Sequence, residues 1–234
     1  TREGILKHCS LRKAAELGDI GQRFIHKQQA GLEAQLANLA DEIAYNNHDI
    51  DDGLRAGLID MQQLQGVSLF REQCDLVKTA YPDLPERRIV HEVVRRMINH
   101  QVVDLVETSQ AQLAATQLAD SDAVRRLSQP LIGFTPAMQA QNLELKQFLR
   151  KNLYQHYRVR RMTSKAARVI NGLFDAFMND PYLLPPESLR NVQAFEQHQR
   201  DMGRARAVAD YIAGMTDRFA IKEYDRLFNP FQLT

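Results

Sequence analysis

Two carboxylates and a phenol recur at four-residue intervals in one alanine-rich segment of the sequence. Asp41, Tyr45 and Asp49 occupy positions i, i+4 and i+8, so in a helix their side chains form a row along one side. Such a row could hold a metal ion at one end and contact the polar groups of a ligand further along. From the residues alone, an ion pair between Asp41 and an arginine of a neighbouring helix is favoured over a metal site by about two to one.

The helix that carries this row has small or apolar residues on both sides. One stripe is apolar and consists of Leu32, Leu36, Leu39 and Ile43. The opposite side holds alanines and polar residues beside Tyr45, namely Ala34, Ala37, Asn38, Asp41 and Ala44. We therefore expect the helix to be buried on both sides. An unpaired Asp41 carboxylate would then be costly, which favours a paired, protonated or metal-bound state.

Three blocks of sequence together resemble a known family. They run from Glu33 through Asp41, Tyr45 and His48-Asp49 to Gly57, from Asn152 to Ala166, and from Asp210 to Ala220. In this order they resemble segments of the HD-domain deoxynucleoside triphosphate triphosphohydrolases of the dGTPase-like family. The blocks extend from near the start of the chain to near its end, and together they are specific.

The resemblance implies an all-α, multi-helix HD-domain-like bundle with a C-terminal helical extension. It implies hydrolysis of a dNTP, dGTP among them, to the deoxynucleoside and triphosphate, in a homo-oligomer that uses a divalent metal ion such as Mg²⁺ or Mn²⁺. Asp41 matches the distal aspartate ligand of that metal. Tyr45 and Asp49 match positions that meet the deoxyribose and phosphate end of the substrate. Further substrate contacts are expected at Arg161 and Arg218, and an anion site at Tyr154, His156 and Lys165.

In one respect the chain departs from the family pattern. The family's first metal-binding histidine and its His-Asp pair lie upstream of the segment that Asp41 matches, before Thr1. We therefore expect the chain to be a fragment with no complete catalytic set and no appreciable turnover of its own.

A different placement of the metal site uses the dipeptide within this chain. His26, His48-Asp49 and Asp104 follow the order of a histidine, a His-Asp pair and a distant aspartate. These residue types suit a divalent metal that polarises phosphate and activates water. This alternative would be an HD phosphohydrolase acting on another substrate. It is disfavoured, because His48 lies just beyond the block that already matches the distal-aspartate segment.

The densest basic run surrounds the second block and is interleaved with Tyr154, His156 and Tyr157. It consists of Arg150, Lys151, Arg158, Arg160, Arg161, Lys165 and Arg168. Arginine and aromatic side chains together suit triphosphate, a regulatory nucleotide or single-stranded DNA. A solvated helix face with paired arginines remains equally open, and so does a non-enzymatic binding or assembly module. Arg218, beside Asp217, is more simply interpreted as half of an internal ion pair, and Thr216 before them could cap a final helix.

Apolar residues at three- and four-residue intervals predict helices throughout. The expected ranges are 31–47, 49–57, 67–80, 85–117, 136–155, 162–179, 186–200 and 203–228, with Thr135 as an N-cap before Pro136. We expect residues 1–120 to form the C-terminal part of an HD-type core and residues 121–234 a helical region packed on it.

Composition narrows the class of protein. The 234 residues are 44% hydrophobic and carry a net charge of +1, so bulk charge predicts no nucleic-acid binding. The two cysteines have no metal-type spacing, which suits a reducing cytoplasm. The sequence has no apolar run long enough to cross a bilayer and no signal peptide, so we expect a cytoplasmic protein without a membrane partner. No P-loop, Rossmann glycine pattern or nucleophile elbow is present, so kinase, dehydrogenase and α/β-hydrolase functions have no support.

Overall fold

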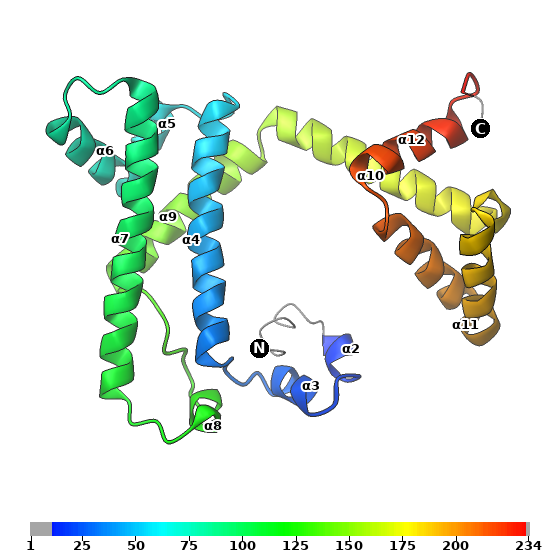
Figure 1. Ribbon diagram of the computed structural model, residues 1–234, viewed down its shortest axis with the longest axis horizontal. Coiled ribbons are helices and arrows are strands. Elements are labelled where there is room, and N and C mark those ends of the chain that lie inside the picture. The colour runs from blue at the N-terminus through cyan, green and yellow to red at the C-terminus, as the bar shows by residue number, and fades with distance from the viewer. Residues whose placement is uncertain (1–10, 233–234) are drawn as a thin grey trace. The chain divides into compact units, whose positions relative to one another are not determined.

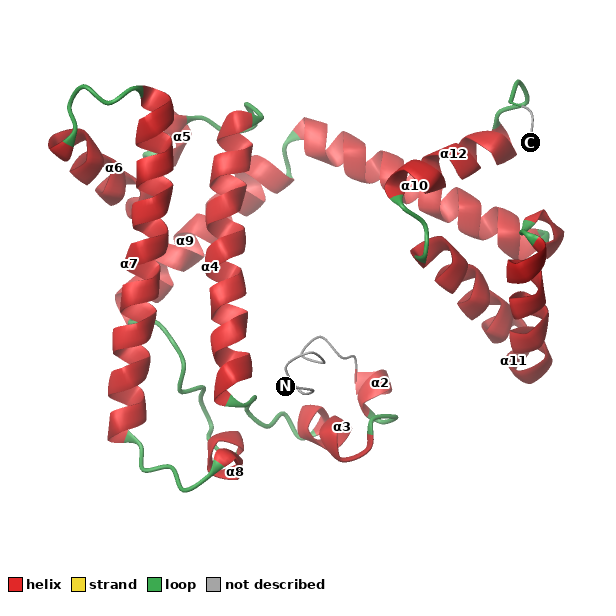
Figure 2. Cartoon of the chain, viewed as in Figure 1, coloured by secondary structure: helices red, strands yellow, loops and turns green. Residues whose placement is uncertain are grey.

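The computed structural model describes residues 11–232, and this part of the chain is helical without a strand, which confirms the all-α prediction (Figure 2). The chain divides into two compact units between His156 and Tyr157. The boundary expected at residue 120 instead falls in the loop between α7 and α8 of the first unit. None of the helices that the structure describes has the length and apolar character needed to cross a membrane.

The first unit is built around four long helices (Figure 1). Its elements are α2 (Leu11–Ala14), α3 (Gly18–Ile25), α4 (Leu32–Arg55), α5 (Met61–Leu64), α6 (Ser68–Ala80), α7 (Glu86–Ala115), α8 (Ser121–Arg125), α9 (Pro136–Leu149) and the π-helical turn η1 (Arg150–Tyr154). Helix α7 packs against α4 and α6, and α9 also packs against α4 and α6. Ile50, Phe70, Met97 and Leu145 are fully buried where they meet.

Side-chain hydrogen bonds fix the loop that leads into α9. The Gln35 side chain accepts hydrogen bonds from the backbone N–H groups of Leu131 and Ile132 at 3.0 and 3.1 Å. Asp104 of α7 accepts from the Thr135 backbone N–H at 2.9 Å and from its hydroxyl at 2.6 Å. Thr135 in turn caps α9 ahead of Pro136, as expected. These contacts set the position of α9 and, through it, of η1.

The second unit consists of α10 (Tyr157–Asn179), the short η2 (Pro181–Leu183), α11 (Pro186–Ala213) and α12 (Asp217–Phe228). Helix α11 reverses direction at Arg200, whose φ of 49° and ψ of −130° are not helical. Its two segments fold back on one another (Figure 1). Gly203 lets them approach, because a Cβ there would lie 2.2 Å from the Phe195 carbonyl oxygen. Leu173, Phe177 and Val208 form the centre of a separate core.

Several element boundaries differ from those expected. The ranges 31–47 and 49–57 form one helix, α4, because Ile50 and Gly53 continue its buried side. The range 203–228 is divided before α12, where the Thr216 side chain accepts a hydrogen bond from the Phe219 N–H and caps a new helix. The short helices α2, α3, α5 and α8 were not predicted.

Candidate functional site

Helix α4 exposes the side that carries the predicted row. Asp41 is exposed, the Tyr45 side chain is 58% exposed and Asp49 is half-buried. The expectation that both sides of α4 are buried is therefore wrong for this chain: Ala37 and Ala44 are exposed as well. Within the first unit, the core forms on the opposite side of α4. Asp41 thus bears no burial cost here, and the desolvation argument for a metal does not apply to the described residues alone.

A tyrosine from a distant segment completes the row. Tyr154, in the π-helical turn after α9, donates a hydrogen bond from its hydroxyl to Oδ2 of Asp49. Its ring lies 6.4 Å from that of Tyr45, centroid to centroid, at 39°. Partial burial, followed by hydrogen bonds to Asp49 and Tyr45, raises the pKa of Tyr154 well above its ordinary value. Tyr154 is therefore a neutral donor at physiological pH, which fixes one carboxylate oxygen of Asp49.

The alternative centre at His48-Asp49 is not assembled. Among the residues that the structure describes, no three or more His, Cys, Asp or Glu side chains are grouped so as to hold a metal. Asp104 is instead bonded to Thr135, and His26 is exposed just after α3. His48 is exposed on the same side of α4 as Asp41, seven residues away.

The remaining predicted residues are divided between the units. His156 is half-buried at the end of the first unit, and Arg161, Lys165 and Arg218 are exposed in the second. Arg161 and Lys165 lie one turn apart on α10. Asp217 and Arg218 begin α12, and neither forms an ion pair with another described residue, so the expected internal Asp217–Arg218 pair is not present. The structure therefore brings together Tyr45, Asp49 and Tyr154.

The basic run lies in a stretch of sequence without acidic residues. No aspartate or glutamate occurs between Glu144 and Asp175, a stretch with eight lysines and arginines. Every residue from Arg160 to Arg168 is exposed, so this part of α10 buries no face in the structure. Lys146 pairs with Glu42, its Nζ lying 2.5 Å from Oε1 of that residue. The segment is a strongly positive, accessible surface.

Buried amides on the core side were not singled out from the sequence. Asn46 of α4 and Asn142 of α9 are each 5% exposed. The Asn46 amide nitrogen and both polar atoms of Asn142 have no hydrogen-bond partner in the described structure. Short polar residues on a core face are a weak sequence signal, because Asn is common on exposed helix faces too. They lie on α4 and α9, the two helices that position Asp49 and Tyr154.

Comparisons with known proteins give a consistent result. The family model of the phosphohydrolase-associated domain matches residues 132–226. A deoxyguanosinetriphosphate triphosphohydrolase-like protein of Bordetella pertussis is 55% identical over 228 residues, which cover 97% of this chain and 57% of the relative. Proteins with the same name from Nitrosomonas europaea and Thiobacillus denitrificans are 52% and 50% identical, again over 97% of this chain and 59% and 58% of their own length. The chain thus spans somewhat over half the length of these relatives.

Proposed function

We propose that this chain belongs to the deoxyguanosinetriphosphate triphosphohydrolase-like family and forms part of a metal-dependent dNTP triphosphohydrolase. The reaction adds water to a dNTP, dGTP among them, and yields the deoxynucleoside and inorganic triphosphate. The Tyr154–Asp49 hydrogen bond beside Tyr45 is the observation that supports a substrate site here. Asp49 and Tyr45 lie on the same helix as the exposed Asp41.

A divalent metal requires more ligands than the described residues supply. Asp41 provides one carboxylate, and no group of three candidate ligands surrounds it in the described part of the chain. The described residues by themselves therefore do not fit a metal. We propose that Asp41 is a single ligand of a site completed by residues outside the described part of this chain.

The residues of this chain bind and orient the substrate in this proposal. The neutral Tyr154 hydroxyl engages one Asp49 oxygen, which leaves the other oxygen to accept a hydrogen bond from a sugar hydroxyl. Tyr45, exposed beside the Tyr154 ring, offers an aromatic face and a hydroxyl to the same ligand. Arg161, Lys165, His156 and Arg218 are proposed to contribute to triphosphate binding.

The test joins this chain to the portion of the Bordetella pertussis relative that it does not match. Triphosphate release from dGTP and metal content are measured for this chimera and for the chain alone. We expect the chimera, and not the chain by itself, to bind metal and to hydrolyse dGTP. Asp41→Ala in the chimera should abolish both metal binding and hydrolysis. Asp75→Asn, at an exposed position on α6, is the charge control and should change neither.

Two results would count against the proposal. If the chain alone binds metal and hydrolyses dNTP, and His48→Ala abolishes the activity, the centre is His48-Asp49 of an HD phosphohydrolase. If the chimera folds and binds metal but releases no triphosphate from any dNTP, the proposed reaction is wrong.

The positive segment of α10 supports a second candidate function, the binding of nucleotide or single-stranded DNA. Its exposed arginines, beside the exposed Tyr157 ring, offer phosphate contacts and an aromatic face for a base. Binding of a fluorescent oligothymidylate should weaken steeply with salt, and Arg160→Gln with Lys165→Gln should reduce the slope. Binding that survives Asp41→Ala would separate this function from hydrolysis. Salt-independent binding, or none at low salt, would exclude it.

A further inference from the structure

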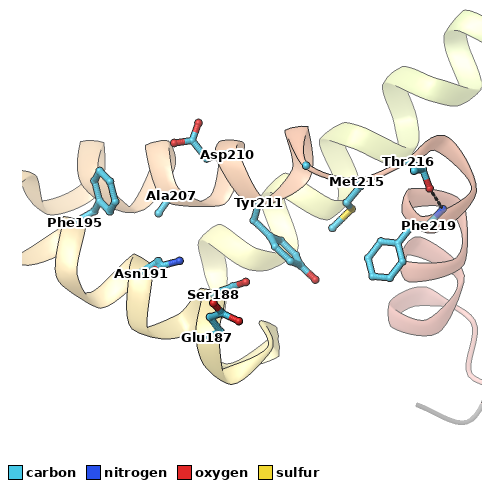
Figure 3. A pocket seen from close by; sticks show the side chains of 11 residues that line it. Glu187, Ser188, Asn191, Phe195, Ala207, Asp210, Tyr211, Met215, Thr216 and Phe219 are labelled. Atoms are coloured by element: carbon cyan, nitrogen blue, oxygen red, sulfur yellow. Dashed lines mark hydrogen bonds between the residues drawn. The ribbon is translucent and has the colours of Figure 1, made fainter.

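The second unit contains a cavity that the proposed hydrolase site does not use. The two segments of α11 and the start of α12 line an open cavity of about 680 Å³. Figure 3 shows the side chains of Tyr211, Met215 and Phe219 on one side, and Glu187 and Ser188 on the other. A volume of this size accommodates a small organic molecule.

The lining combines aromatic rings with negative charge. Phe195, Tyr211 and Phe219 contribute rings, and Phe195 and Phe219 are 45% and 41% exposed. The eleven lining residues include the carboxylates of Glu187 and Asp210 and no lysine, arginine or histidine. Asp210 is paired with Arg206, whose Nε lies 2.7 Å from its Oδ2, whereas Glu187 forms no ion pair with any described residue.

Tyr211, one of the lining residues, carries an unsatisfied polar atom that lies outside the accessible surface of the cavity. Its ring packs edge-on against Phe177, with centroids 5.5 Å apart, and its hydroxyl oxygen is buried without a hydrogen-bond partner in the described structure. Burial, with the charge of Glu223 as a smaller cause, raises the pKa of Tyr211, so the hydroxyl stays neutral. A buried hydroxyl without a partner is costly, and this one offers no contact to a ligand in the cavity.

We propose that this cavity binds an organic cation, namely a guanidinium, amidinium or ammonium group on an apolar body. Aromatic faces attract such a cation, and the free Glu187 carboxylate would form a charge-assisted hydrogen bond with it. A nucleotide phosphate would instead meet the unpaired Glu187 carboxylate, and the lining offers it no basic side chain, so the cavity selects against the anionic substrate proposed for the α4 site.

The test uses three probes of the same shape and different charge on the whole chain. Benzamidine is cationic, benzamide neutral and benzoate anionic, and their binding is measured by ligand-observed NMR. We expect benzamidine to bind at least about tenfold more tightly than either analogue. Glu187→Gln should weaken benzamidine binding by about tenfold or more. Asp201→Asn, which removes an exposed carboxylate outside the lining, should leave it unchanged.

Tyr211→Phe is a control for the cavity wall. The variant keeps the ring that packs on Phe177 and removes a hydroxyl that is buried without a partner among the described residues, so neither the melting temperature nor benzamidine binding should fall. Equal binding of benzamide or benzoate, or benzamidine binding that is indifferent to Glu187→Gln, overturns the proposal. None of these readouts depends on dNTP hydrolysis.

The cation could be a free molecule or a basic side chain of a second copy of this chain. Sedimentation velocity with and without benzamidine distinguishes the two sources. If a second copy supplies the cation, self-association is reversed by benzamidine and by Glu187→Gln. If the cation is a free molecule, benzamidine binds and the sedimenting mass does not change.

Discussion

Tyr154 donates a hydrogen bond to Asp49 although 105 residues separate them in the sequence. The bond joins the π-helical turn after α9 to the middle of α4, and it places the Tyr154 ring beside Tyr45. An acid and two phenols thereby form one polar cluster next to the exposed side of α4. The Tyr154–Asp49 hydrogen bond of this cluster is both a contact between two helical elements and part of the proposed substrate site. Substitutions in the cluster should therefore change both the stability of the chain and its activity.

Tyr154→Phe should change the alkaline limit of stability. The pKa of Tyr154 in the folded chain lies above its ordinary value of 10.0, chiefly because of burial. Above pH 10 the unfolded chain loses this proton while the folded chain keeps it, so stability falls as pH rises. Urea midpoints at pH 8, 10 and 11 should therefore shift in favour of Tyr154→Phe with rising pH. Tyr182→Phe, at a 79% exposed tyrosine, serves as control. A parallel decline in wild type and Tyr154→Phe would contradict this prediction.

In the active chimera, Tyr154→Phe should reduce kcat/KM for dGTP by about tenfold, since it removes one hydrogen bond to a charged group. The physical reason is that Asp49 loses the donor that fixes one of its oxygens. Steady-state triphosphate release measures the effect, with far-UV circular dichroism to verify the fold. An unchanged kcat/KM in a folded variant would remove Tyr154 from the proposed site.

Gln35→Leu should destabilise the first unit by about 2–4 kcal/mol. The Gln35 side chain is 8% exposed, accepts from two backbone N–H groups and donates to the Ala30 carbonyl at 2.7 Å. Leucine would leave those groups buried without a partner. Chemical denaturation measures the loss, and Gln62→Leu, at an exposed position on α5, should stay within about 0.5 kcal/mol. Equal effects of the two substitutions would show that the loop is held by other contacts.

Glu92 should contribute stability that depends on acid pH. Hydrogen bonds from Arg95 and Arg96 lower the pKa of Glu92 from 4.5 to about 2. A lowered pKa stabilises the folded chain above pH 4.5, and this contribution disappears as pH falls toward 2. The stability difference between wild type and Glu92→Gln should therefore narrow between pH 5 and pH 2, and it should be small because the pair is at the surface. A difference that is constant over this range would disprove the linkage.

Local signals in the sequence are sufficient to predict some elements. Thr135-Pro136 marks the start of α9, and the prolines before Glu86 mark the start of α7, because N-cap and proline preferences act within a few residues. The break expected between 200 and 203 is present as well, since the chain reverses at Arg200. The range 203–228 continues past the end of α11 because the apolar pattern runs across Gly214, whereas the predicted cap at Thr216 is confirmed as the start of α12.

The row of Asp41, Tyr45 and Asp49 follows from helical spacing, whereas its surroundings do not. An alanine-rich side indicates that a close neighbour is tolerated, but it does not show that one is present, and in the described chain this side is open. The partner of Asp49 depends on how α9 is placed against α4, which is fixed by tertiary contacts such as Glu42–Lys146. No local pattern encodes a contact across 105 residues.

Gly203→Ala should be among the most damaging small substitutions in the second unit. A Cβ at this position would lie 2.2 Å from the Phe195 carbonyl oxygen and 2.5 Å from its carbon, both backbone atoms that cannot rotate away. The two segments of α11 would have to separate, at a cost of at least about 2 kcal/mol. Gly214→Ala is the matched control: its φ is −77°, and a Cβ there would lie 3.5 and 3.6 Å from its nearest neighbours, at ordinary van der Waals distance. It should be neutral or slightly stabilising, since alanine restricts the unfolded chain more than glycine does. Thermal unfolding followed by circular dichroism compares the two, and similar melting temperatures would mean that the α11 segments are not in close contact in solution.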